Sequence, residues 1–104
     1  MLLLSALIAC RNNINYMIRQ KYILCGRVQH IGFRFRAGMI ASHFPITGWI
    51  ENLDHGDVEL QVQGEQETIQ HFFRKLQQLP GVQITHVYIE ELPLIAETNF
   101  RARS

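Results

Sequence analysis

Apolar residues recur along the chain with two different spacings, and the shorter spacing predicts the strands. Residues 21–28 are mostly apolar and lead into a polar loop with glycines, which predicts a central strand buried on both faces. Residues 47–53 have the composition of a second strand. Residues 58–63 alternate between apolar and polar side chains, as in a half-buried strand with one face in water. Turn-forming residues at 54–57 should join these two strands into a hairpin.

Two further segments have apolar residues at helical spacing. The first helix is expected to reach Phe44, because the proline that follows disfavours a helical conformation there. The second should end at Pro80 and Gly81. The apolar positions of the first stripe are Ala37, Ile40, Ala41 and Phe44, and those of the second are Ile69, Phe72, Phe73, Leu76 and Leu79.

Residues 82–90 and 99–103 add a fourth strand and a short final one. The sequence therefore predicts an α+β fold, a ferredoxin-like α/β sandwich of order β-α-β-β-α-β plus a short final edge strand. Both helices should lie on one face of an antiparallel sheet. The large aromatic residues have helical or strand spacing, so we expect all of the following in the core: Phe33, Phe35, Phe44, Trp49, Phe72 and Phe73.

The chain has 104 residues, enough for one domain, which we place at residues 17–104. Residues 1–16 begin with an apolar run, but they lack the initial positive charge of a secretory signal and are too short to span a bilayer. We therefore expect an N-terminal extension that is unstructured or reflects a misassigned start, with Met17 the natural first residue. The expected location is the cytoplasm.

Charge and composition limit the partners. The formal net charge is +1 and no block of like charges occurs, which argues against nucleic acid and membrane surfaces as partners. Cys10 and Cys25 form no C-x-x-C pair, and Cys25 is expected to be a small apolar strand residue without a redox role. The five histidines lack metal-site spacing, so neither a metal nor a cofactor is expected. A chain of this size and polarity is expected to be a monomer.

Residues 26–34 join the first strand to the first helix and contain the main candidate site. Backbone N–H groups of such a loop can converge at the helix N-terminus, where unpaired donors and the helix dipole attract an anion. Arg34 and Arg36 stand at the same helix start, where a cation is unfavourable unless something negative is bound. We expect Arg34 to hold the anion and Arg36 to extend into solvent.

Two motifs in this chain resemble the signatures of the acylphosphatase family. The first is carried by Gly26, Val28, Gln29, Phe33 and Arg34, and the second by Gly48, Trp49, Ile50, Asn52 and Gly56. The resemblance extends over about residues 19–103, including Gly64 and residues 100–103. It implies a hydrolase that cleaves carboxyl phosphates and binds inorganic phosphate. It also implies Arg34 and Asn52 as catalytic residues, and a phosphate-binding loop of Gln29, His30, Ile31, Gly32, Phe33 and Arg34.

The chemistry that the resemblance implies requires few groups. A carboxylate is a stable leaving group at neutral pH, so no general acid is needed. Phosphoryl transfer passes through a loose transition state that is stabilised mainly by positioning and by positive charge. The planar donors of Arg34 match a phosphate, and the side-chain carbonyl of Asn52 can orient the attacking water.

His30 stands where the family pattern has glycine, which leaves an alternative open. If that position requires φ > 0, histidine adopts it at a cost of roughly 1–2 kcal/mol. The alternative is an acylphosphatase-like anion-binding module with weakened or lost catalysis. A third hypothesis is an RNA-recognition-motif protein, which has the same order of elements but stacks bases on aromatic residues of its third strand. Residues 58–63, the expected third strand, contain no aromatic residue, which argues against this hypothesis.

Overall fold

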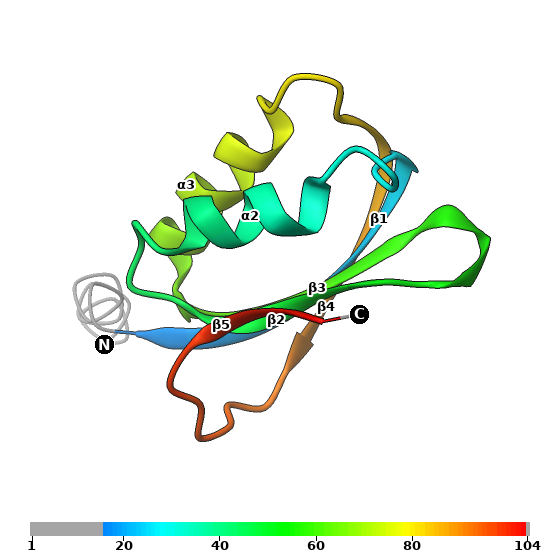
Figure 1. Cartoon of the computed structure of the whole chain (residues 1–104). Coiled ribbons are helices and arrows are strands. Elements are labelled where there is room, and N and C mark those ends of the chain that lie inside the picture. Colours follow the sequence, from blue (N-terminus) through cyan, green and yellow to red (C-terminus); the bar gives the residue numbers. More distant parts are fainter. Residues whose placement is uncertain (1–15, 104) are drawn as a thin grey trace, which may run out of the picture.

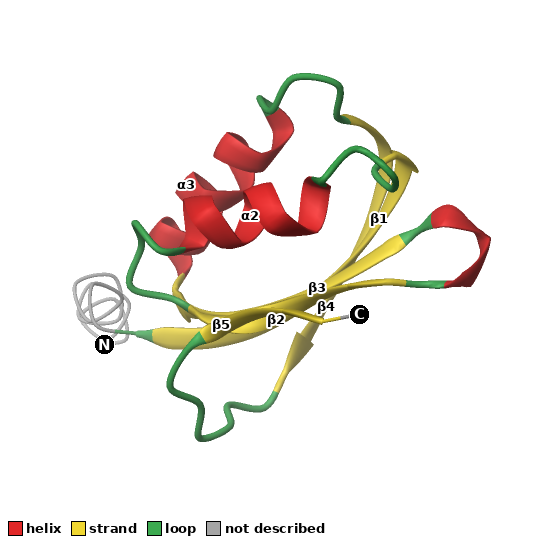
Figure 2. Ribbon diagram, in the orientation of Figure 1, coloured by secondary structure: helices red, strands yellow, loops and turns green. Residues whose placement is uncertain are grey.

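Two helices cover one face of a five-stranded sheet in the computed structural model, which describes residues 16–103 (Figures 1 and 2). The helices are α2 (Phe33–Ala41) and α3 (Gln66–Gln77), and the short 3-10 turn η2 (Asp54–Gly56) lies in the hairpin. The strands are β1 (Met17–Arg27), β2 (Thr47–Asn52), β3 (Val58–Glu65), β4 (Gln83–Leu92) and β5 (Phe100–Arg103). The expected extension at residues 1–16 lies outside the described residues, apart from Tyr16.

The strand order is β4-β1-β3-β2-β5. The first four strands pair antiparallel, and β5 pairs parallel with β2. The predicted ferredoxin-like α+β fold is confirmed, but the sheet is mixed rather than wholly antiparallel. The reason is the path of residues 93–99, which cross from one edge of the sheet to the other so that β5 runs in the direction of β2 (Figure 1).

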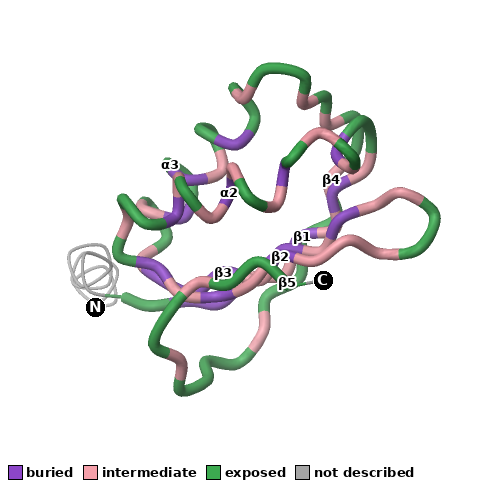
Figure 3. Tube along the Cα trace, viewed as in Figure 1, coloured by how far each residue is buried: buried purple, intermediate pink, exposed green. Residues whose placement is uncertain are grey.

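The core lies between the helices and the facing side of the sheet (Figure 3). β1 contributes alternate residues to it, with Tyr22 and Leu24 buried. The intervening side chains of Lys21, Ile23 and Cys25 are only partly buried. The prediction that this strand is buried on both faces is therefore wrong, because α2 and α3 both cover the same face and leave the second one open.

Two of the six expected core aromatics lie elsewhere. Phe35 is 70% exposed, because it follows the buried Phe33 by two residues and a helix turns by about 200° over that interval. Trp49 lies between Gly48 and Ile50, which both face the helices, so it points to the opposite face. The other four are buried or packed against the core: Phe33, Phe44, Phe72 and Phe73.

The first helix ends earlier than expected, at Ala41. The next amides bond to carbonyls three residues back, with distances of 3.0 Å from His43 N to Ile40 O and 3.0 Å from Phe44 N to Ala41 O. These tighter turns still place Phe44 against the core. The spacing of Phe44 therefore indicated the buried side correctly but not the helix end.

Glycines allow two close backbone approaches next to the candidate site. A Cβ atom on Gly26 would lie 2.1 Å from the carbonyl oxygen of Gln83, and one on Gly48 would lie 2.0 Å from that of Gln61. Both glycines also have positive φ, 130° and 144° respectively. Any side chain at either position would push neighbouring strands apart, so these motif glycines are required by packing.

Candidate active site

A pocket of about 180 Å³ opens between the β1–α2 loop and the end of β2. Both residues expected to be catalytic, Arg34 and Asn52, line it although they come from different elements. Of the expected loop residues, all except Ile31 line the pocket as well. The full lining is Val28, Gln29, His30, Gly32, Phe33, Arg34, Phe35 and Asn52.

The loop reaches the helix through two left-handed residues. His30 has φ 64° and Gly32 has φ 72°. A positive φ favours glycine, which agrees with the glycine that the family pattern has at the position of His30. Gly32 is the N-cap of α2, and among the described residues neither a capping side chain nor an acidic residue serves its first turn. The N–H groups at this helix start are therefore available to an anion in the pocket.

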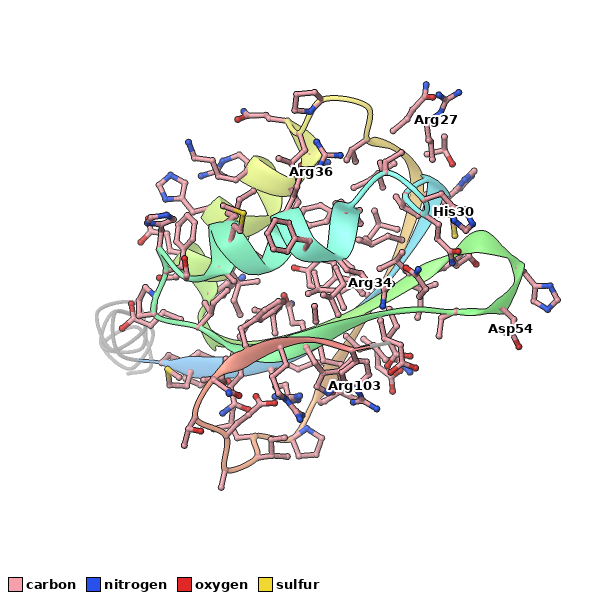
Figure 4. The ribbon with its side chains drawn as sticks, viewed as in Figure 1. Arg27, His30, Arg34, Arg36, Asp54 and Arg103 are labelled. Atoms are coloured by element: carbon pink, nitrogen blue, oxygen red, sulfur yellow. The ribbon has the colours of Figure 1, made fainter. Side chains whose placement is uncertain are left out.

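Arg34 is held at the pocket by the last strand of the sheet. Its Nη1 atom donates a hydrogen bond to the backbone carbonyl of Arg103, and the side chain is partly exposed (Figure 4). Within residues 16–103 the Arg34 side chain makes no other hydrogen bond. The remaining N–H groups of its guanidinium can therefore bind an anion. The contact also fixes where those groups point.

Asn52 ends β2 and lines the pocket, and its side-chain carbonyl has no hydrogen-bond partner among the described residues. The Oδ1 atom is buried and accepts no hydrogen bond from any described residue. A buried acceptor left unpaired by the protein is uncommon in folded proteins and is free to accept one further hydrogen bond. The geometry of Asn52 therefore suits an acceptor for a bound water.

Gln29 has a role that the sequence did not reveal. Its Nε2 atom donates to the carbonyl of Leu53 at 2.8 Å and to that of Asp57 at 2.7 Å. The side chain therefore ties the loop to the β2–β3 hairpin that carries Asn52. Because both acceptors are backbone atoms, no residue type at positions 53 and 57 could have predicted the contact.

The expectation that Arg36 extends into solvent is wrong. Its guanidinium donates to the carbonyl of Ile31 at 3.0 Å and to that of Pro80 at 2.9 Å. It lies beside the turn that follows α3, as Figure 4 shows. The partial negative charges of these two carbonyl oxygens offset part of the repulsion between the guanidinium and the positive end of the helix dipole.

Other expectations concern thiols, metals and membranes. Cys25 lies in β1, and desolvation together with the nearby charge of Asp57 raises the pKa of its thiol, which disfavours the reactive thiolate. Within residues 16–103, no group of three metal-binding side chains comes together. In that same part of the chain, no helix is both long and apolar enough to cross a membrane.

A family model described as Acylphosphatase matches residues 20–102. The chain belongs to the acylphosphatase family of hydrolases. An acylphosphatase from Bacillus licheniformis is 37% identical over 76 residues, which cover 72% of this chain and 84% of the relative. An acylphosphatase from Clostridium perfringens is 45% identical over 60 residues, or 58% and 67% of the two chains.

Solved acylphosphatase structures have the same fold. The acylphosphatase from Coxiella burnetii superposes with a TM-score of 0.77 at 32% identity, over 86% of this chain and 95% of the other. The one from Bacillus subtilis gives 0.77 at 28% identity, over 84% and 99%. The outer side chains of β3 are Glu59, Gln61 and Gln63. This strand therefore carries none of the stacking aromatic residues on which the RNA-recognition hypothesis depends.

Proposed function

We propose that this protein hydrolyses acyl phosphates to a carboxylate and inorganic phosphate, with the phosphoryl group bound by residues 29–34 and the water oriented by Asn52. The observation that supports this most directly is one pocket that both Arg34 and Asn52 line, with the Oδ1 atom of Asn52 left unpaired by the described residues. A cation and an unpaired acceptor in residues of the same pocket suit a phosphoryl group and a water at the same time.

The phosphoryl group is held by hydrogen-bond donors from one short segment. The N–H groups at the start of α2 and the free N–H groups of Arg34 surround its oxygens, and the helix dipole adds positive potential. These donors are already in place before the substrate arrives. They therefore stabilise the charge of the transition state without rearranging.

Asn52 orients the nucleophile. Its Oδ1 atom accepts a hydrogen bond from the water, whose lone pair then faces the phosphorus atom. The water oxygen bonds to phosphorus while the bond from phosphorus to the acyl oxygen breaks and its electron pair leaves with the carboxylate. The water proton passes to the phosphate product. The carboxylate needs no proton to depart, because its conjugate acid has a pKa of about 4.

Hydrolysis of benzoyl phosphate by the purified protein, with inorganic phosphate as a competitive inhibitor, tests the proposal. Arg34→Ala should lose both phosphate binding and turnover, whereas Asn52→Ala should lose turnover and keep phosphate binding. Arg74→Ala, an exposed arginine on α3, is the matched control and should behave as the wild type. Ordinary turnover in either pocket variant contradicts the assigned roles.

The alternative is a binding module with weakened catalysis, and the left-handed conformation of His30 is the observation that favours it. Phosphate binding by the wild type without any hydrolysis of benzoyl phosphate would establish this alternative. The proposal also includes a cytoplasmic monomer that acts on small acyl phosphates and binds no nucleic acid, in keeping with the net charge of +1. Light scattering and cell fractionation test those points.

A further inference from the structure

Arg36 connects the phosphate loop to a distant turn of the fold. Its Nη2 atom donates to the carbonyl of Ile31 at 3.0 Å, and its Nη1 atom donates to the carbonyl of Pro80 at 2.9 Å. Pro80 belongs to the turn between α3 and β4, which is closed by a 3.1 Å hydrogen bond from Val82 N to Leu79 O. One guanidinium thus bridges a loop of the pocket and a turn that is held independently of it.

The contact with Ile31 has a consequence for the next amide. In a trans peptide the carbonyl and the following N–H point in opposite directions, and the described residues contain no cis peptide bond. Ile31 does not line the pocket, whereas Gly32 does. When Arg36 draws the Ile31 carbonyl away from the pocket, the N–H of Gly32 is therefore turned toward it.

The Arg36 side chain is partly buried and holds this bridge with both ends of its guanidinium. Its Nε atom is buried without a partner in the part of the chain that the structure describes, and its two terminal nitrogens each bond a carbonyl. Arg36 also opens the helical hydrogen bonding, since its backbone N donates to Gly32 O at 2.9 Å. Backbone and side chain together hold the peptide units on both sides of Gly32.

We propose that Arg36 is a positioning residue of the phosphate site: by holding the Ile31 carbonyl, it aims the Gly32 N–H at the bound phosphoryl group. The inference rests on the proposed function for the identity of the ligand, but it is tested by the binding of inorganic phosphate, which needs no turnover. Arg36 itself does not touch the ligand, because it does not line the pocket.

Titration calorimetry with inorganic phosphate compares four proteins: the wild type, Arg36→Gln, Arg36→Lys and Arg74→Gln. Arg36→Gln should weaken phosphate binding by about tenfold or more, because the Gly32 N–H is then no longer aimed at the charged phosphate and its hydrogen bond is lost. Arg36→Lys keeps the charge but cannot reproduce the planar two-carbonyl contact, so it should bind several-fold more weakly than the wild type. Arg74→Gln removes the same charge from the surface of α3 and should bind phosphate as the wild type does.

Two readouts separate positioning from a purely structural tie. In amide NMR spectra, phosphate should shift the Gly32 resonance strongly in the wild type and weakly in Arg36→Gln. With benzoyl phosphate, KM should rise more than kcat falls. A folded Arg36→Gln protein with wild-type phosphate affinity overturns the proposal, even if its melting temperature is lower.

Each of the remaining outcomes supports or contradicts the role proposed for Arg36. If Arg36→Gln does not fold, unchanged phosphate affinity in Arg36→Lys overturns the proposal, and several-fold weaker affinity supports it. A wild type that binds phosphate without hydrolysing benzoyl phosphate contradicts the proposed function but leaves the Arg36 comparison valid. A wild type that binds no phosphate overturns both.

Discussion

The side chain of Arg34 donates a hydrogen bond to the backbone carbonyl of Arg103, which joins the phosphate loop to the last strand of the sheet. The two residues are 69 positions apart in the chain. The Arg103 side chain makes separate contacts, an ion pair with Glu51 at 3.1 Å and a cation–π contact with the Trp49 ring at 4.0 Å. The carbonyl, not the guanidinium, is therefore the part of Arg103 that orients Arg34.

Removal of residues 100–104 should weaken phosphate binding by several-fold to tenfold, because Arg34 then loses the acceptor that fixes its guanidinium. Arg103→Ala keeps the carbonyl and should change phosphate affinity by less than about twofold, in line with the small value of exposed ion pairs. Calorimetry with inorganic phosphate measures both. Equal losses in the two proteins would show that the side chain matters more than the strand.

Gln29→Glu should reduce kcat/KM for benzoyl phosphate by more than tenfold. The carboxylate faces the carbonyls of Leu53 and Asp57 and places negative charge beside the phosphoryl group. Gln29→Ala leaves those two carbonyls unpaired, which costs about 1–3 kcal/mol of folding free energy by the usual value for an unsatisfied buried group. Gln70→Glu, on the exposed side of α3, is the control and should be neutral. Full activity in Gln29→Glu would mean that the loop does not depend on the hairpin.

His30→Gly should raise turnover of benzoyl phosphate several-fold, because glycine adopts φ 64° without strain and cannot crowd the pocket. His55 provides a matched control, since it also has positive φ (71°) but does not line the pocket. His55→Gly should relieve similar strain, seen as a shift in melting temperature, without a change in turnover. Unchanged turnover in His30→Gly would show that the geometry at this position is not limiting.

The sequence predicted the order and type of all the main elements because their signals are local. Alternation in β3 and the apolar stripe of α3 depend only on neighbours a few residues away. Arg34 and Asn52 were also predicted, and the structure places both on one pocket. Their proximity follows from the fold, since the loop after β1 and the end of β2 lie at the same end of the sheet.

The supporting contacts could not be predicted in the same way. Gln29 and Arg36 both bond backbone carbonyls, and every residue has a carbonyl, so no residue type marks the partner. Phe35 was misplaced for a different reason. An aromatic residue in a helix indicates burial only if its angular position faces the core, and Phe35 lies across the helix from Phe33. Its exposed ring instead lines the pocket.

The open face of the sheet carries an ion pair between the buried Arg19 and the partly buried Glu97, which holds the segment leading to β5. Arg19 is 1% exposed, and its Nη1 atom lies 2.7 Å from Oε1 of Glu97. The same guanidinium donates to Oε1 of Gln61, at 3.0 Å from Nη2, and to Oε1 of Gln63, at 3.3 Å. Gln63 in turn exchanges two hydrogen bonds with the backbone of Ile95. This network fixes residues 95–97 just before the strand that holds Arg34.

Arg19→Leu should therefore lower the free energy of unfolding by about 3 kcal/mol, since it leaves the largely buried Glu97 carboxylate without its partner. The double variant Arg19→Leu/Glu97→Leu should recover much of that loss, because two apolar side chains replace two charges. Urea unfolding measures both. Lys21→Met is the control: its pair with Glu90 is longer, at 3.5 Å, and more exposed, so its loss should change stability by less than about 1 kcal/mol. If the double variant is no more stable than Arg19→Leu, the burial of the unpaired carboxylate is not the cause, and the hydrogen bonds from Arg19 to the two glutamines carry the stability instead.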